Sequence, residues 1–169
     1  MTWPAMRPVP DPVGPGEESV WDYPRPPRLE PVAHRLRVVL GGAVIAETGA
    51  GFRVLETSHP PTYYLPPDDV ARDALANPRR GGICEWKGQA VLFDVRGGDR
   101  HAPGAAWTYP DPTPGFARIA GYIAFYAGPM DACFVGADRV TPQPGSFYGG
   151  WITPGIVGPF KGGSGTMGW

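Results

Sequence analysis

The stretch RLRVVLGGAVIAE, residues 35–47, decides the fold because it joins two apolar runs through a pair of glycines. Alternating apolar and polar residues place one kind of side chain on each face of a β-strand, and a Gly-Gly loop is typical of a hairpin. The run FRVLET, residues 52–57, follows a further Gly-Ala-Gly and is expected to extend the same meander. The sequence therefore predicts an antiparallel sheet that begins near residue 35.

Beyond the hairpin the chain continues in short apolar runs separated by turn residues. These runs are ICEWKG (83–88), QAVLFDV (89–95), AAWTY (105–109), GYIAFY (121–126), DACFVG (131–136) and ADRV (137–140). One short helix is predicted over DDVARDALA, residues 68–76, capped by Asp68 or Asp69. Residues 145–169 are rich in glycine and aromatic residues and have little strand character. Short strands at close intervals favour an all-β, mainly antiparallel fold, either a sandwich or barrel-like.

The N-terminal segment differs from this body. Residues 1–31 contain nine prolines, which remove backbone donors and favour extended structure. Trp3, Trp21 and Tyr23 lie within this segment, and such large apolar groups suggest that it packs against the body. We therefore expect a Pro-rich arm, followed by a single mainly-β domain over residues 32–169.

Composition limits the class of protein. The chain has 169 residues, the usual size of one domain, and 42% of them are hydrophobic, which is enough apolar surface for a core. Glycine and proline, at 25 and 23 residues, then separate short elements rather than indicate disorder. The net charge of −1 provides no field that attracts a polyanion or a membrane surface, so we expect neither nucleic acid nor a membrane as partner.

Location and cofactors are predicted from what the sequence does not contain. The first residues have no apolar run of the signal-peptide kind, and no stretch approaches the ~18 to 20 apolar residues of a membrane span, so we expect a cytoplasmic protein. Cys84 and Cys133 have no CxxC spacing, which indicates two reduced, largely buried thiols rather than a zinc site or a disulfide. We expect a function that needs no metal and no cofactor.

Two candidate catalytic groups lie in and just after the run FRVLE. Strand alternation places Glu56 on the face of Phe52 and Val54, and a carboxylate carried toward a core has a raised proton affinity unless it is compensated. His59 follows three residues later, so the turn could bring imidazole and carboxylate together for proton transfer. Equally, Glu56 could cap backbone amides of the turn and His59 could brace the proline-rich loop. Arg53, in the same run, is a further ligand-binding candidate.

A lysine is the third catalytic candidate. In CEWK, residues 84–87, alternation would place the cysteine and the tryptophan on one face and the glutamate and Lys87 on the other. Lys87 could pair with Glu56 or bind an anionic or carbonyl group of a ligand, although most lysines are solvated surface groups. The segment GPFKGGSGT, which contains Lys161, resembles a phosphate-binding loop only superficially, because the GxxxxGK[ST] order is absent.

Aromatic residues provide the more specific signal. In GYIAFY, Tyr122, Ala124 and Tyr126 share one face of the expected strand, while Ile123 and Phe125 take the other. Two phenols around a small residue are typical of a ligand pocket wall. The other candidates for this wall are Tyr63, Tyr64, Trp86, Trp107 and Tyr109. For any single tyrosine the alternative is an aromatic core whose hydroxyls bond to backbone carbonyls.

Taken in order, several of these segments resemble a known family. They are LETSHPPTYYLP (55–66), EWKGQA (85–90), AAWTYPDP (105–112), IAGYIAFY (119–126) and FYGGWITPGIVGPFKGG (147–163). The chain from Arg35 to Trp169 resembles the bacterial and fungal family called Domain of Unknown Function 427, except that Glu85 stands where the family has a proline. The resemblance implies a compact all-β domain and no established activity. The family label alludes to nucleotidyl transfer, but the sequence shows no paired carboxylates of the kind that hold Mg²⁺ and phosphate.

Two functions from different classes stay open. The first is a cofactor-independent acid/base enzyme of the isomerase, lyase or hydratase type, in which Glu56 and His59 move a proton and Lys87 polarises or neutralises the substrate. The second is a non-catalytic module that binds a ligand or, through the Pro-rich arm, a protein. In both cases we expect the partner to be a small molecule held in an aromatic-lined pocket. Whether the protein forms a homodimer is left open.

Overall fold

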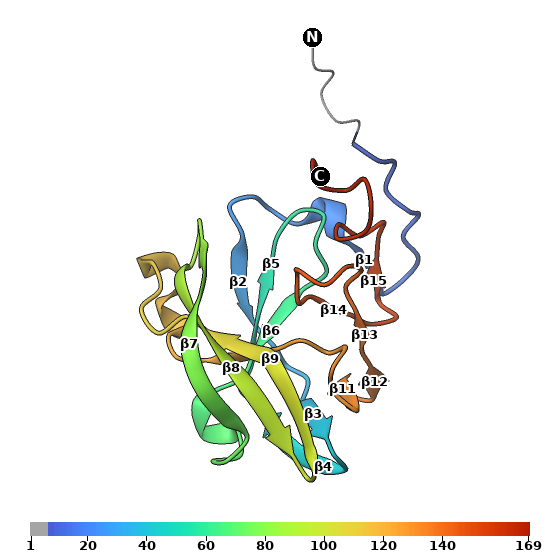
Figure 1. Cartoon of the computed structure of the whole chain (residues 1–169). Coiled ribbons are helices and arrows are strands. Elements are labelled where there is room, and N and C mark those ends of the chain that lie inside the picture. Colours follow the sequence, from blue (N-terminus) through green and yellow to red (C-terminus); the bar gives the residue numbers. More distant parts are fainter. Residues whose placement is uncertain (1–6) are drawn as a thin grey trace.

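The computed structural model describes residues 7–169 and consists mainly of antiparallel strands, which confirms the all-β class (Figure 1). The strands form three larger sheets and two pairs of very short strands, and none of the sheets in residues 7–169 closes into a barrel. Trp3 lies outside the described residues. Among the helices of this part of the chain, none has the length and apolar character that crossing a bilayer requires.

The first sheet contains the predicted hairpin. Its strands, in order, are β12 (Asp138–Arg139), β11 (Ala132–Val135), β3 (Leu36–Leu40) and β4 (Ala43–Thr48). The loop between β3 and β4 consists of Gly41 and Gly42, whose φ angles are 60° and 75°. A tight hairpin turn requires this left-handed conformation at both positions, and glycine adopts it without a steric penalty. The hairpin prediction is therefore confirmed.

The strand β5 (Phe52–Leu55) does not extend this meander, contrary to the prediction for residues 52–57. It lies at the centre of a second sheet, between β2 (Arg28–Pro31) and β6 (Thr62–Tyr64). Gly51 brings the chain tightly past Leu36, where a Cβ on residue 51 would lie 2.5 Å from Leu36 Cδ1. The strand then pairs with the Pro-rich arm, a partner that the local sequence pattern does not reveal.

The third sheet is the longest. Its strands, in order, are β10 (Ile123–Phe125), β9 (Arg100–Thr108), β8 (Gly88–Gly97) and β7 (Leu75–Cys84). In Figure 1, β7, β8 and β9 form a long twisted ribbon on one side of the molecule, away from the C-terminal segment. A single antiparallel bridge between Leu65 and Ile123 joins the second sheet to β10.

The segment predicted as a short helix, residues 68–76, contains only one 3₁₀ turn, η2 (Pro67–Asp69). Within it the Ala74 N–H donates to the Ala71 carbonyl at 3.0 Å, but other backbone groups bond to neighbouring strands. The Ala71 N–H donates to the Ile45 carbonyl at 2.7 Å, and the Ala74 carbonyl accepts a hydrogen bond from β8 at 2.8 Å. Tertiary pairing therefore outweighs the weak helix propensity of a segment this short.

The described part of the Pro-rich arm packs against the C-terminal segment. β1 (Glu18–Ser19) pairs in parallel with β15 (Ile156–Val157), and the 3₁₀ turn η1 (Val20–Asp22) follows β1. The Trp21 ring meets the Trp169 ring edge-on at 5.6 Å, and Trp21 Nε1 donates to the Pro159 carbonyl at 2.9 Å. The contact expected of Trp21 and Tyr23 is confirmed, since both are buried. The division into arm and domain at residue 31 stays a prediction.

The buried apolar residues form three clusters. The largest lies between the first and third sheets, the second lies beneath β9 and β10, and the third holds the arm. The remaining short elements are η3 (Pro114–Ile119), β13 (Thr141–Pro142) and β14 (Trp151–Ile152). Both cysteines are free: Cys84 is half-buried, and burial of Cys133 in the largest cluster raises the pKa of its thiol to about 12.

Candidate functional site

One cavity of about 540 Å³ collects the three residues predicted as catalytic, Glu56, His59 and Lys87. We name it the His59 cavity. It is bounded by the end of β5, the turn between β7 and β8, and the segment 143–161. Five of the eight ligand-binding candidates also line it: Tyr64, Trp86, Trp107, Tyr109 and Tyr126.

The turn after β5 brings the carboxylate and the imidazole together, as the sequence predicts. Val54 and Glu56 both line the cavity, in agreement with strand alternation. The His59 N–H donates to the Glu56 carbonyl at 3.0 Å, and Ser58 between them has a φ of 75°. His59 Nε2 lies 3.8 Å from Glu56 Oε2, just beyond the length of a hydrogen bond.

The side chain of Gln143 determines which nitrogen of His59 carries the proton. Gln143 Oε1 accepts from the Gly150 N–H at 3.0 Å, and Gln143 Nε2 donates to the Lys161 carbonyl at 2.8 Å. These two bonds fix the amide orientation, because a flipped amide would place two donors or two acceptors against each other. Gln143 Nε2 also lies 3.1 Å from His59 Nδ1 and can only donate to it. His59 is therefore neutral, with its proton on Nε2 and facing Glu56.

The surroundings of His59 disfavour the charged imidazolium. Burial lowers its pKa to about 4, and the positive charges of Lys161, Arg25 and Lys87 act in the same direction. At neutral pH the imidazole therefore acts as a fixed N–H donor rather than as a base. This differs from the expectation of a histidine poised for proton transfer near neutral pH, since loss of water and the neighbouring cations both disfavour the charged form.

Glu56 has its own counter-ion. Arg25 Nη2, from the Pro-rich arm, lies 3.4 Å from Glu56 Oε2, with the Glu56 side chain 23% exposed and that of Arg25 41% exposed. An ion pair this open to water contributes little to stability but balances the carboxylate charge. The Arg25 guanidinium also donates to the Thr57 carbonyl at 2.9 Å, which holds the arm against this turn.

Lys87 lies in the turn between β7 and β8, so strand alternation does not apply to it. Residues 85–87 form this turn, and Trp86 and Lys87 both line the cavity, contrary to the prediction that they lie on opposite faces. The Thr113 hydroxyl donates to the Trp86 carbonyl at 2.6 Å and holds the turn in place. The Lys87 ammonium lies over the rings of Tyr109 and Phe116, 5.5 and 5.8 Å from their centroids, which are distances typical of cation–π contacts.

Part of the aromatic wall comes from Trp107 on β9 and from Tyr109 and Tyr126, which directly follow β9 and β10. Trp107 and Tyr126 pack with ring centroids 4.7 Å apart, and the Tyr126 hydroxyl donates to the Phe147 carbonyl at 3.0 Å. The predicted alternation of β10 is confirmed, because Ile123 and Phe125 enter the largest core while the residues on either side of them face the second cluster. Burial raises the pKa of Tyr126, so this phenol stays protonated.

Three ligand-binding candidates lie outside the lining of the His59 cavity. Arg53 Nη1 pairs with Glu18 Oε1 at 2.6 Å and Arg53 Nη2 with Glu30 Oε1 at 2.7 Å, so this guanidinium joins the arm to β5. Tyr63 stacks on Trp151 in the core, with centroids 5.2 Å apart. Tyr122 packs edge-on against Phe52 at 5.7 Å. Each of these side chains contacts a partner from a distant segment, and these contacts stabilise the fold.

Six lining residues come from a segment for which the sequence predicts no role: Gln143, Ser146, Phe147, Tyr148, Gly149 and Lys161. The Lys161 N–H donates to the Ser58 carbonyl at 2.9 Å, and the Tyr148 ring meets the His59 ring edge-on at 4.6 Å. The sequence marks this region only by the aromatic and glycine-rich composition of residues 145–169. Composition does not predict a place in the site, because only the fold brings these residues beside the turn after β5.

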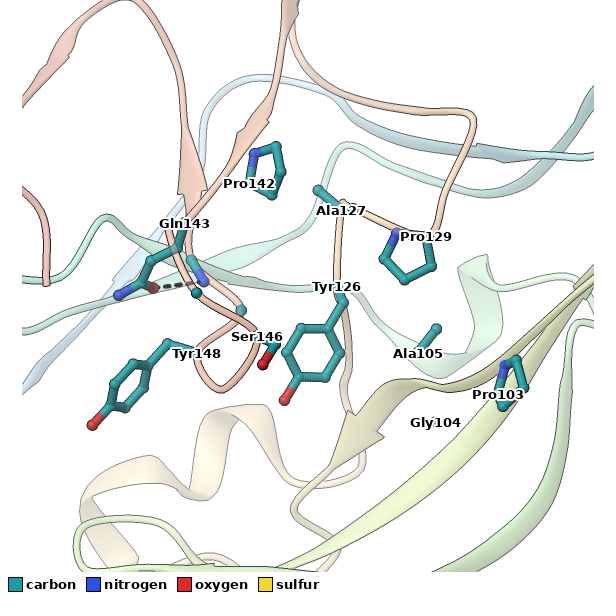
Figure 2. A pocket seen from close by; sticks show the side chains of 14 residues that line it. Pro103, Gly104, Ala105, Tyr126, Ala127, Pro129, Pro142, Gln143, Ser146 and Tyr148 are labelled. Atoms are coloured by element: carbon teal, nitrogen blue, oxygen red, sulfur yellow. Dashed lines mark hydrogen bonds between the residues drawn. The ribbon is translucent and has the colours of Figure 1, made fainter. Parts of the chain in front are cut away.

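A second cavity, of about 490 Å³, shares Tyr126, Gln143, Ser146, Tyr148 and Gly149 with the lining of the His59 cavity (Figure 2). Pro103, Pro129 and Pro142 line it, and Figure 2 shows the Tyr126 and Tyr148 phenols pointing away from Pro129 and Pro142. Its lining residues include no charged side chain. The charged side chains that line a cavity in this region line the His59 cavity, which we take as the candidate site.

The His59 cavity thus offers the Glu56 carboxylate, the exposed carboxylate of Glu85, one neutral imidazole N–H, two ammonium groups and a set of aromatic faces. This set can hold a small molecule by stacking and by charge, and Glu56 can accept a proton from it. In the part of the chain that the structure describes, no group of three or more His, Cys, Asp or Glu side chains is arranged to hold a metal ion.

Comparison with known proteins identifies the family but not a function. A family model described as "Domain of unknown function (DUF427)" matches residues 28–136, which is more than half of the chain. The match begins with β2 in the arm and ends just after β11, so it includes Glu56, His59 and Lys87. No curated protein matches the chain.

Proposed function

We propose that this chain, which belongs to the family described as Domain of unknown function (DUF427), binds a small organic molecule in the His59 cavity. The observation that carries the proposal is the convergence of Glu56 and His59, from the turn after β5, with Lys87, from the turn between β7 and β8, on one aromatic-lined hollow. Pockets for small molecules have this composition, with mostly apolar walls and a few converging polar groups. The cavity volume of about 540 Å³ is in the range that such ligands require.

The acid/base enzyme is the second candidate, and Glu56 supports it. Its carboxylate lines the cavity and faces the His59 Nε2–H, a donor that could stabilise negative charge on a substrate as Glu56 removes a proton. In this form of the proposal His59 is a neutral hydrogen-bond donor and Glu56 alone is the base. Lys87 would neutralise the developing charge.

The two candidates differ in the expected effect of Glu56→Gln. We first expect members of a metabolite library to raise the melting temperature of the parent protein, because a ligand that binds only the native state stabilises it. For an enzyme, Glu56→Gln abolishes turnover of such a ligand while its binding is retained. For a binding module, no hit is turned over by either protein, and the substitution alters affinity alone. The measurements are thermal shift, then chromatography of hits incubated with each protein.

The Glu56→Gln protein is expected to fold normally, because its ion pair with Arg25 is open to water and contributes at most about 1 kcal/mol. Glu47→Gln is the matched control, since Glu47 forms a similarly open ion pair with Arg35 at 3.7 Å, on β4. The site of binding is checked by NMR, from the indole N–H signals that a hit shifts. Hits that raise the melting temperature of the parent and of both variants equally, and that shift the signal of Trp21 rather than those of Trp86 and Trp107, would bind elsewhere. That result would refute the proposal.

A further inference from the structure

The two lysines of this protein both lie in the His59 cavity. The sequence has 15 basic residues, and 13 of them are arginines, so Lys87 and Lys161 are its only lysines. They lie 74 positions apart in the chain, on different elements, yet both line the same hollow. The arginines, in contrast, form most of the ion pairs of the described residues.

The buried Lys87 ammonium has no carboxylate partner. Within residues 7–169 no ion pair with an Asp or Glu side chain includes Lys87 or Lys161. Lys87 is only 9% exposed, and its ammonium contacts two aromatic rings. Lys161 is half-buried; its Nζ donates to the main-chain oxygen of Trp169, the last residue of the sequence, at 3.3 Å and lies over the Tyr148 ring at 5.5 Å. Burying a charge without a counter-ion costs free energy. A lysine buried in this way therefore indicates that the bound ligand supplies the negative charge.

The other charged groups of the cavity do not supply that negative charge. The Glu56 carboxylate is paired with Arg25, His59 is held neutral by Gln143, and Glu85 lies exposed at the rim. The buried charge of Lys87 is therefore left without a carboxylate, and Lys161 adds a second positive charge to the same lining. A ligand that carries a negative charge would compensate both.

The rest of the lining indicates an apolar body on that ligand. Trp107, Tyr109 and Tyr126 form the wall, and the rim includes Ile83 and Phe147, which are 79% and 78% exposed. Large apolar side chains this exposed, beside one cavity, are typical of ligand-binding sites. The loop around Lys161 does not offer a backbone cradle for a bare phosphate, because the amides of Lys161 and Gly162 donate to Ser58 and Thr166.

We infer that the ligand of the His59 cavity is an organic anion, a carboxylate on an apolar body, held by Lys87 and Lys161. This inference rests on the proposed function. The aromatic faces contact the apolar body, and the two ammonium groups bind the carboxylate. The His59 Nε2–H is available as a further donor, because Gln143 directs that proton into the cavity.

The test compares 2-naphthoate with the neutral 2-naphthamide, two probes of the same shape. By titration calorimetry the parent protein is expected to bind the carboxylate at least about 10-fold more tightly than the amide. Lys87→Met and Lys161→Met should each reduce carboxylate affinity by about 10-fold and leave amide affinity unchanged, while Lys→Arg at either position restores part of the loss. Methionine keeps most of the apolar stem, so these proteins are expected to fold.

Arg118→Met is the matched control, since it also removes one positive charge, from a guanidinium that lies over the Phe52 ring outside both cavities. It should leave both affinities unchanged. Equal affinity for carboxylate and amide, or equal loss in the control, would overturn the inference while leaving the proposed function intact. Inorganic phosphate that displaces the naphthoate at equal concentration would also overturn it. Failure of both naphthalene probes and of the whole metabolite library to bind would instead refute the proposed function.

Discussion

A Trp151→Ala protein is expected to unfold with a free energy about 3–5 kcal/mol below that of the parent chain. Trp151 is 1% exposed, stacks on Tyr63 and donates its indole N–H to the Phe125 carbonyl at 2.9 Å. Its loss leaves a cavity in the largest core and an unpaired carbonyl. Urea unfolding followed by far-UV circular dichroism measures the difference.

The same substitution should weaken ligand binding, because Trp151 anchors the segment that closes the site. Its backbone N–H donates to the Pro61 carbonyl at 2.8 Å, and β14 pairs with β13 directly before the loop 143–150. Phe147→Ala is the control for stability: this ring is 78% exposed, so its removal should change the unfolding free energy by less than about 0.5 kcal/mol. A similar loss of unfolding free energy in both variants would show that Trp151 does not stabilise the core.

Replacing Gln143 with leucine should cost about 3 kcal/mol of unfolding free energy. Leucine fills a similar volume but makes no hydrogen bonds. The buried Gly150 N–H loses its acceptor, and the Lys161 carbonyl and His59 Nδ1 lose their donor. The turn after β5 and the C-terminal segment then lose their side-chain connection and keep only backbone hydrogen bonds such as that from Lys161 to Ser58, so affinity for cavity ligands should fall as well. Urea unfolding and calorimetry measure the two effects.

Gln89→Leu is the matched control for Gln143→Leu. The Gln89 side-chain amide also donates to backbone carbonyls, those of Gly81 and Ala90, but it lies on β8 next to the edge strand, where water can replace it. Its loss should cost less than half as much and leave ligand affinity unchanged. An equal loss of unfolding free energy at both positions would contradict the account. It would show that the Gln143 hydrogen bonds do not hold the turn after β5 against the C-terminal segment.

Local pattern was enough to predict the elements whose partners are close in the chain. The Gly41-Gly42 hairpin and the alternation of β10 are both confirmed because period-two patterning and turn chemistry are local properties. The neighbourhood of Glu56 and His59 was also predictable, since only a three-residue turn separates them.

Elements that depend on distant partners were not predictable in this way. The segment 68–76 forms its hydrogen bonds with β4 and β8, and β5 pairs with the Pro-rich arm instead of β4. Lys87 lies in a turn, where strand alternation gave the wrong face. Gln143 and Lys161 enter the site from a segment with almost no regular structure, which no periodicity marks.

The central claim is that segments from both halves of the chain enclose His59 in one cavity, where it stays neutral beside two lysines. Titration of the His59 imidazole by ¹⁵N-detected NMR tests this directly, with the signal assigned from its absence in His59→Asn. The account predicts a pKa of about 4 and, at pH 7, a proton on Nε2. A pKa near the ordinary value of 6.5, or a proton on Nδ1, would contradict it, because His59 would then be open to water and free of Gln143.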